Sequence, residues 1–170
     1  MCLKPNMLRG AFLLLFVVSL HVPSVTHAGA GYPYTAECSV YGLKRPKPTP
    51  KKDAASQIAA RARYENEGMA LHSKSKWKES NCLLIHALNI STDHAANLIN
   101  VVGFNYAALG SDGEALKYFE EATAFSFDLD TWVQYKKKAP FNKILTKPIY
   151  QNHEALLVKY YKDMGLPIPK

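Results

Sequence analysis

Residues 96–129 read ANLINVVGFNYAALGSDGEALKYFEEATAFSFDL, and they predict two short helices joined by a tight turn. Apolar residues recur there at intervals of three and four, which is the spacing of an amphipathic helix. The run Gly110-Ser111-Asp112-Gly113 separates the two periodic segments. Small residues, Gly103 on the first helix and Ala115 on the second, allow the two helix axes to come close together. We expect Phe119 to fill the space between them.

The preceding stretch carries the same pattern 35 positions earlier, which is the interval from Gly68 to Gly103. Residues 61–94 read RARYENEGMALHSKSKWKESNCLLIHALNISTDH. A fixed interval of this length is typical of proteins built from repeated helical pairs. The pairs of residues that keep the interval are Gly68/Gly103, Leu71/Tyr106, Ser80/Ala115, Leu84/Phe119 and Ala87/Ala122. With no proline between Ala54 and Ala139, we expect helices near 54–72, 76–89, 94–108 and 113–126.

At these positions the chain resembles the tetratricopeptide repeat (TPR) family. The matching residues are Val102, Gly103, Tyr106, Ala115, Phe119 and Ala122. The resemblance is weaker over 61–94, where Leu71 and Ser80 replace the family's usual tyrosine and alanine, and neither copy ends in the family's proline. It implies an all-α fold, a short α-solenoid of antiparallel helical hairpins. We expect two TPR-like repeats within residues 53–129 and a degenerate capping hairpin within residues 130–170.

The resemblance also implies a function, because TPR proteins bind a protein or peptide in a concave groove lined by the first helix of each hairpin. The matched register gives the candidate lining residues as Glu65, Asn66, Met69, His72, Asn97, Asn100, Val101 and Phe104. The three asparagines offer donors and acceptors to a peptide backbone, although local or water-mediated hydrogen bonds are an equal alternative for each. Met69 and Phe104 would supply apolar pockets.

Residues 1–30 predict a secretory signal peptide, with basic residues at Lys4 and Arg9, a short apolar run over 11–20 and the small residues Ala28-Gly29-Ala30. The alternative is an uncleaved anchor, but the apolar run is shorter than the roughly 20 residues that span a bilayer. We therefore expect an exported chain, either periplasmic or secreted.

Cleavage would remove Cys2 and leave Cys38 and Cys82. An even pair of cysteines in an exported chain predicts a disulfide. This bond would attach an N-terminal arm to the first hairpin, whereas two independent thiols are the alternative. The arm, residues 31–52, is rich in proline and lysine and is predicted to be extended. It is either a solvated linker or a contact to an anionic surface.

The C-terminal residues 130–170 predict a helix that opens at Asp130 and ends near Pro140, followed by a last helix over residues 148–164. These residues do not continue the repeat pattern. Trp132 and Tyr160 are predicted to be core or docking residues, not ligand contacts.

The sequence favours no enzymatic chemistry, cofactor or metal. It has no nucleophile elbow, phosphate loop or His-Glu-x-x-His run. Cys82 and His86 share a helical face at i and i+4, but no second close pair completes a metal site, and a disulfide at Cys82 would remove the thiol. The net charge of +7 is divided between the arm and a lysine cluster beyond residue 135. The acidic stretch 112–130 lies between them, which argues against nucleic acid.

We therefore expect an exported, non-enzymatic TPR-like adaptor or scaffold that binds a protein partner. Two alternatives stay open. In one, the basic arm and the Lys136–Lys138 run hold the protein on an anionic polymer or membrane. In the other, the short solenoid associates with a second copy of itself.

Overall fold

The computed structural model describes residues 32–33, 38, 54–90 and 95–170. Within these ranges the chain is all-helical and has no strand, as the sequence predicts, and it forms seven α-helices. The predicted signal peptide and nearly all of the basic arm lie outside the described residues. The helices are α1 (Ala54–Ser73), α2 (Trp77–Ile90), α3 (Ala96–Ala108), α4 (Asp112–Phe125), α5 (Leu129–Lys136), α6 (Phe141–Ile144) and α7 (Pro148–Asp163).

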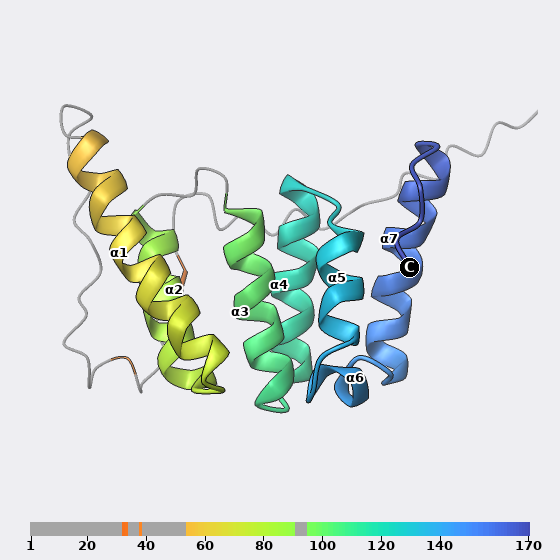
Figure 1. Ribbon diagram of the computed structural model, residues 1–170, viewed down its shortest axis with the longest axis horizontal. Helices are drawn as coiled ribbons and strands as arrows, with labels where there is room; N and C mark the ends of the chain where they lie inside the picture. The colour runs from red at the N-terminus through yellow and green to blue at the C-terminus, as the bar shows by residue number, and fades with distance from the viewer. Residues whose placement is uncertain (1–31, 34–37, 39–53, 91–94) are drawn as a thin grey trace, which may run out of the picture.

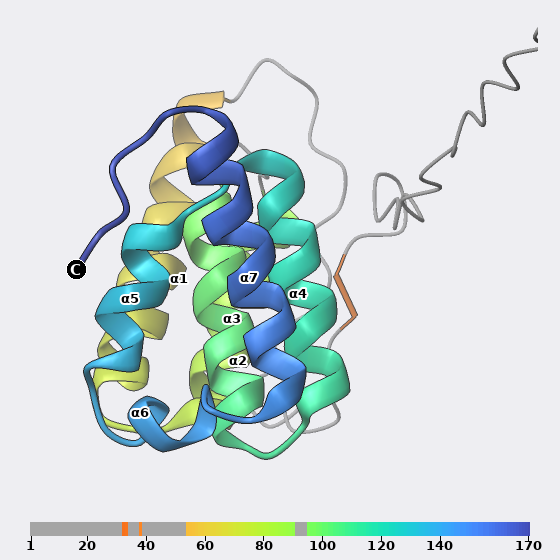
Figure 2. The ribbon, with the colours of Figure 1, turned by 90° about the vertical axis from the view of Figure 1, so that its right-hand side faces the viewer.

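The helices follow one another in chain order along the long axis of the molecule (Figure 1). The most extensive packing is between α1 and α2 and between α3 and α4, and α2 in turn packs against α3. Viewed along the row, α1 and α5 lie on one side and α4 on the other (Figure 2). The four expected helices of the two hairpins are therefore present, with ends that differ from the prediction by one or two residues.

Each hairpin is closed by the same close contact. A Cβ atom built on Gly68 would lie 2.6 Å from Cδ2 of Leu84, and one built on Gly103 would lie 2.6 Å from Cε1 of Phe119. Both distances are shorter than any packed carbon pair, so each glycine is required by the side chain that faces it. The expected close approach at Gly103 is confirmed, and it also occurs at Gly68.

The turns within the two hairpins are also equivalent. The amide of Lys76 donates to the carbonyl of Leu71 (3.0 Å), and the amide of Ser111 donates to that of Tyr106 (2.9 Å). These are the six-to-one hydrogen bonds of a Schellman turn, which needs a left-handed residue just after the helix. Ser75 (φ 58°) and Gly110 (φ 76°) supply that residue.

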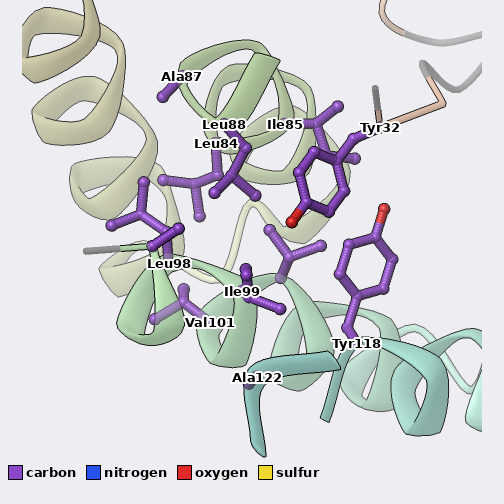
Figure 3. Close-up of a cluster of buried hydrophobic side chains, with 12 residues drawn as sticks. Tyr32, Leu84, Ile85, Ala87, Leu88, Leu98, Ile99, Val101, Tyr118 and Ala122 are labelled. Atoms are coloured by element: carbon purple, nitrogen blue, oxygen red, sulfur yellow. The ribbon is translucent and has the colours of Figure 1, made fainter. Parts of the chain in front are cut away.

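Two clusters of buried side chains form the core. The aliphatic cluster lies among α2, α3 and α4 and is built mainly from Leu84, Ile85, Leu88, Leu98, Ile99 and Val102. Figure 3 shows its side chains converging from α2 and α3, with the rings of Tyr32 and Tyr118 beside them. The aromatic cluster joins the second hairpin to α5, α6 and α7, and its main members are Phe104, Phe119, Trp132, Phe141, Tyr150 and Leu157.

The N-terminal arm is attached to the outer side of the two hairpins at its described residues. Cys38 and Cys82 form a disulfide, with their Cα atoms 5.2 Å apart, which confirms the predicted pair. Tyr32 is 3% exposed, and its backbone amide and carbonyl both bond to the side chain of Asn89 (2.7 and 3.1 Å). Its hydroxyl donates to Glu121 (2.6 Å). The start of the arm is thus part of the core and not only a linker.

The C-terminal helices pack on the second hairpin through polar as well as apolar contacts. Lys136 of α5 bonds to both carboxylate oxygens of Glu154 on α7 (2.8 Å each). At the start of α4, Asp112 accepts from Lys147 (2.8 Å) and from the hydroxyl of Tyr150 (2.6 Å). The short helix α6 was not expected from the sequence. None of the helices described is long and apolar enough to cross a bilayer.

Candidate protein-binding face

The four candidate residues of α1 occupy different environments along one side of the helix. Asn66 is exposed, Glu65 and Met69 are half-buried, and Glu65 lies 3.7 Å from Arg61. Met69 packs against the aliphatic cluster. His72, one turn further on, turns toward α3 and α5. This side of α1 therefore faces the rest of the row, and it is open to solvent at Asn66.

Of the four candidate residues of α3, one is accessible and three are buried. Asn97 is exposed, and Asn100 is 7% exposed. Val101 and Phe104 are only 2% and 1% exposed. The ring of Phe104 stacks on Tyr135 of α5, with their centroids 3.7 Å apart. The expectation that Val101 and Phe104 line an open groove is wrong for this structure, because Val101 lies in the aliphatic cluster and α5 covers Phe104.

His72 is the centre of a buried polar network that joins α1 to α3 and α5. Its Nδ1 lies 2.5 Å from Oδ1 of Asn105, and its Nε2 lies 2.9 Å from the hydroxyl of Tyr135. The side-chain amide of Asn105 donates to Oγ of Ser80 (2.9 Å) and to Oδ1 of Asn81 (2.8 Å). The oxygen of Asn105 is therefore the acceptor for His72. It follows that His72 donates from Nδ1 and accepts the Tyr135 proton at Nε2.

Burial keeps this network uncharged. Burial lowers the pKa of His72, and nearby Lys138 lowers it as well, against the opposing effect of the hydrogen bond to Asn105. Burial also raises the pKa of Tyr135 to about 12. Both side chains are therefore neutral near pH 7. His72 thus acts as a positioning residue that closes one end of the face, and it is not free to bind a ligand.

A narrow cleft separates the second hairpin from the C-terminal helices. Its walls include Asn100 and Phe104 of α3, Trp132 of α5 and His153 of α7. The cleft has no room for a water molecule. Burial lowers the pKa of His153 to about 4, so this imidazole is neutral in the fold. The cleft is therefore a packed boundary within the core and not a binding site. Asn100 and Phe104, both predicted to line the groove, form part of its wall.

Cys82 and His86 are the two residues for which catalysis or metal binding was considered from the sequence. Cys82 is in the disulfide, so the reading of Cys82 and His86 as a nucleophile or a metal pair fails. The ring of His86 packs edge-on against the ring of Tyr64, with the two centroids 4.3 Å apart. In the described ranges no three His, Cys, Asp or Glu side chains gather as metal ligands would.

What remains accessible is a polar surface that we call the α1–α3 face, made of Glu65, Asn66, Met69 and Asn97; Asn100, although predicted to belong to it, is buried. The sequence identified these four residues through their helical register. The sequence did not indicate that α5 and α6 close this face at the end where His72 lies. The signal that could have found it is the aromatic density after residue 130, where Trp132, Tyr135 and Phe141 are spaced to cover a neighbouring helix.

Comparison with known proteins adds no relative: no family model, no curated protein and no solved structure matches the chain.

Proposed function

We propose that this protein is an exported, non-enzymatic adaptor that holds a segment of a partner protein on the α1–α3 face. The observation that carries the proposal is the uneven burial of that face. Asn66 and Asn97 are exposed on neighbouring first helices of the two hairpins, while Met69 packs against the aliphatic cluster and Leu98 lies in it. Exposed amides on a fixed scaffold can bond to a peptide backbone with little loss of side-chain entropy.

Two further features support the proposal. The Gly68–Leu84 and Gly103–Phe119 contacts recur at one interval, as in an α-solenoid of TPR-like hairpins, whose first helices form the binding surface. The disulfide in turn suits an oxidising compartment outside the cytosol. Because the His72 network fills the end of the face near α6, the bound segment would be short and would lie toward the start of α3.

Site-specific photo-cross-linking in the cells that make the protein tests this proposal. A benzoylphenylalanine is placed at Asn66, at Asn97, or at Asn152, an exposed control position on α7. We expect the same discrete protein adduct from positions 66 and 97 and none from 152. The proposal fails if neither face position gives an adduct, or if all three give the same adducts. Thermal unfolding of each variant checks that the fold is unchanged.

A further inference from the structure

Lysines gather along one edge of the molecule, where the turns within the hairpins lie. The α1–α2 turn, the α3–α4 turn and helix α6 all lie along the lower edge in Figure 1. We call this the lysine edge, and its members are Lys74, Lys76, Lys78, Lys137, Lys138, Lys143 and Lys147. Three acidic side chains lie near it: Asp112 is bonded to Lys147 (2.8 Å) and Glu114 to Lys117 (2.6 Å), and the third is Glu79. Lys137 also donates to the backbone oxygen of Lys170. The edge is therefore strongly positive.

Aromatic packing holds the two ends of this edge together. His72 lies against Trp77 and Phe141, with ring centroids 5.1 and 6.2 Å apart, and Trp77 lies 5.7 Å from Phe141. These contacts join the α1–α2 turn to α6. The Nζ atom of Lys138 lies 5.8 Å above the ring of Tyr135 in the same group. The lysines of the first turn and those after α5 thus form one surface on a rigid base.

The chemistry of the lysine edge favours a broad anionic surface over a single anionic group. Every basic residue on it is lysine, whose compact, well-hydrated charge attracts phosphates at a distance, whereas arginine gives the bidentate geometry of specific recognition. The lysines lie at the α1–α2 turn, after α5 and around α6, and the α3–α4 turn between them carries none. Leu109, an exposed apolar side chain, lies at the turn in the middle. A row of lysines around an exposed leucine suits the interface of a membrane.

The opposite edge is less basic than the lysine edge. Asp128 and Asp130 lie at the start of α5, on the upper side in Figure 1. Asp163 lies at the end of α7, where it pairs with Lys159 (3.0 Å) and directly follows Lys162. The molecule therefore has a charge asymmetry along its helices, which would orient it on a charged plane.

We propose that the lysine edge seats this protein on a bilayer surface rich in anionic lipid, with the long helices upright and the α1–α3 face open to the side. This surface shares Lys137 and Lys138 with the basic surface considered from the sequence, but it joins them to the α1–α2 turn and does not include the arm. It is also independent of the α1–α3 face, since none of its lysines belongs to that face.

Vesicle co-sedimentation tests the proposal. The protein is used as its own cells process it, with the N-terminus determined by mass spectrometry. The edge variant is Lys74→Gln/Lys76→Gln/Lys138→Gln/Lys143→Gln. The matched control is Arg63→Gln/Lys117→Gln/Lys159→Gln/Lys162→Gln, which removes the same charge from exposed positions elsewhere. The probes are vesicles of phosphatidylcholine alone and of phosphatidylcholine with about a third phosphatidylglycerol, near physiological salt.

We expect the parent protein to bind only the anionic vesicles and to be released by high salt. Each lysine at an anionic surface contributes about fivefold, so the edge variant should bind at least about 100-fold more weakly. The affinity of the control variant for the anionic vesicles should fall by less than about fivefold. Both variants keep the same N-terminal residues, so any contribution from the arm is shared.

Three results would overturn the proposal. Equal losses in the two variants would show that net charge alone matters. Equal binding to neutral vesicles would show that the lipid charge is irrelevant. Binding to soluble polyphosphate, with none to anionic vesicles, would identify a polymer and not a membrane as the occupant. Thermal unfolding of both variants distinguishes any of these from a loss of fold.

Discussion

The two hairpins share their internal construction but differ in what surrounds them. In each, a glycine on the first helix faces a large side chain on the second, and a left-handed residue closes the turn. The first hairpin is completed by aliphatic residues, the disulfide and Tyr32. The second is completed by the aromatic cluster and the C-terminal helices. A repeated sequence interval therefore defines a hairpin, while the segments before and after it decide how that hairpin is covered.

The largest expected effect concerns the covalent attachment of the first hairpin. Replacing both cysteines, Cys38→Ala/Cys82→Ala, frees a segment closed over a sequence separation of 44 residues. In the chain-entropy view a loop of this size contributes about 4 kcal/mol to the free energy of unfolding. Chemical denaturation should show that loss, and a reductant should destabilise the parent but not the variant. A change below about 1 kcal/mol would show that the arm is held by Tyr32 alone.

The next effect is a loss of stability in acid, and it arises at His153 of α7, which packs against Phe119 of the second hairpin. The pKa of His153 is lowered to about 4 by burial, whereas the unfolded chain has the usual value near 6.5. As the pH falls from about 6.5 to 4, the unfolded state binds a proton that the folded state does not, so stability decreases. The loss from this group should approach about 3 kcal/mol at pH 4.

His153→Phe is the matched variant, since it retains a ring against Trp132 and Phe119. Its unfolding free energy should fall less between pH 7 and pH 4 than that of the parent. His72 and His86, whose pKa values are also lowered by burial, remain in both proteins. Identical pH profiles would contradict the assignment to His153.

A smaller difference is expected between the two glycines. Gly103→Ala should cost about 2 kcal/mol, because its Cβ would meet the buried ring of Phe119 and lie 3.2 Å from the carbonyl of Ala115. Gly68→Ala should cost about 1 kcal/mol: its Cβ would lie 2.8 Å from Cγ and 3.3 Å from the backbone nitrogen of Leu84, but an aliphatic side chain can change rotamer more easily than a buried ring. Urea unfolding of the two variants measures the order, and the reverse order would contradict the account.

The smallest effects are at the turns and have opposite signs. Ser75 has a φ of 58°, which is strained for a residue with a Cβ atom. Ser75→Gly should therefore stabilise the first hairpin by about 1 kcal/mol, and Gly110→Ser should destabilise the second by a similar amount. Ser73→Gly, within α1, is the control and should be destabilising. A loss of stability in Ser75→Gly would argue against equivalent turns.

Features that depend on residues close together in the sequence could be predicted, whereas features that depend on residues far apart could not. The helices, their turns and the contact at Gly103 depend on residues close in sequence, and the interval of 35 positions made them visible. The accessibility of the candidate face depends on residues far away. Phe104 is covered by Tyr135, and His72 is held by Asn105 and Tyr135. No local pattern specifies such contacts, and the same holds for Tyr32, which reads as part of an extended arm but is buried.

The central claim is that one contact, made twice at a fixed interval, builds both hairpins. Double-mutant cycles test it directly, using Gly68→Ala with Leu84→Ala and Gly103→Ala with Phe119→Ala. Within each hairpin, the smaller partner should remove most of the cost of the added methyl group, giving coupling energies of about 1 and 2 kcal/mol. The crossed cycle, Gly68→Ala with Phe119→Ala, should couple by less than about 0.5 kcal/mol. Coupling in the crossed cycle as large as that within a hairpin, or none within either hairpin, would contradict the claim.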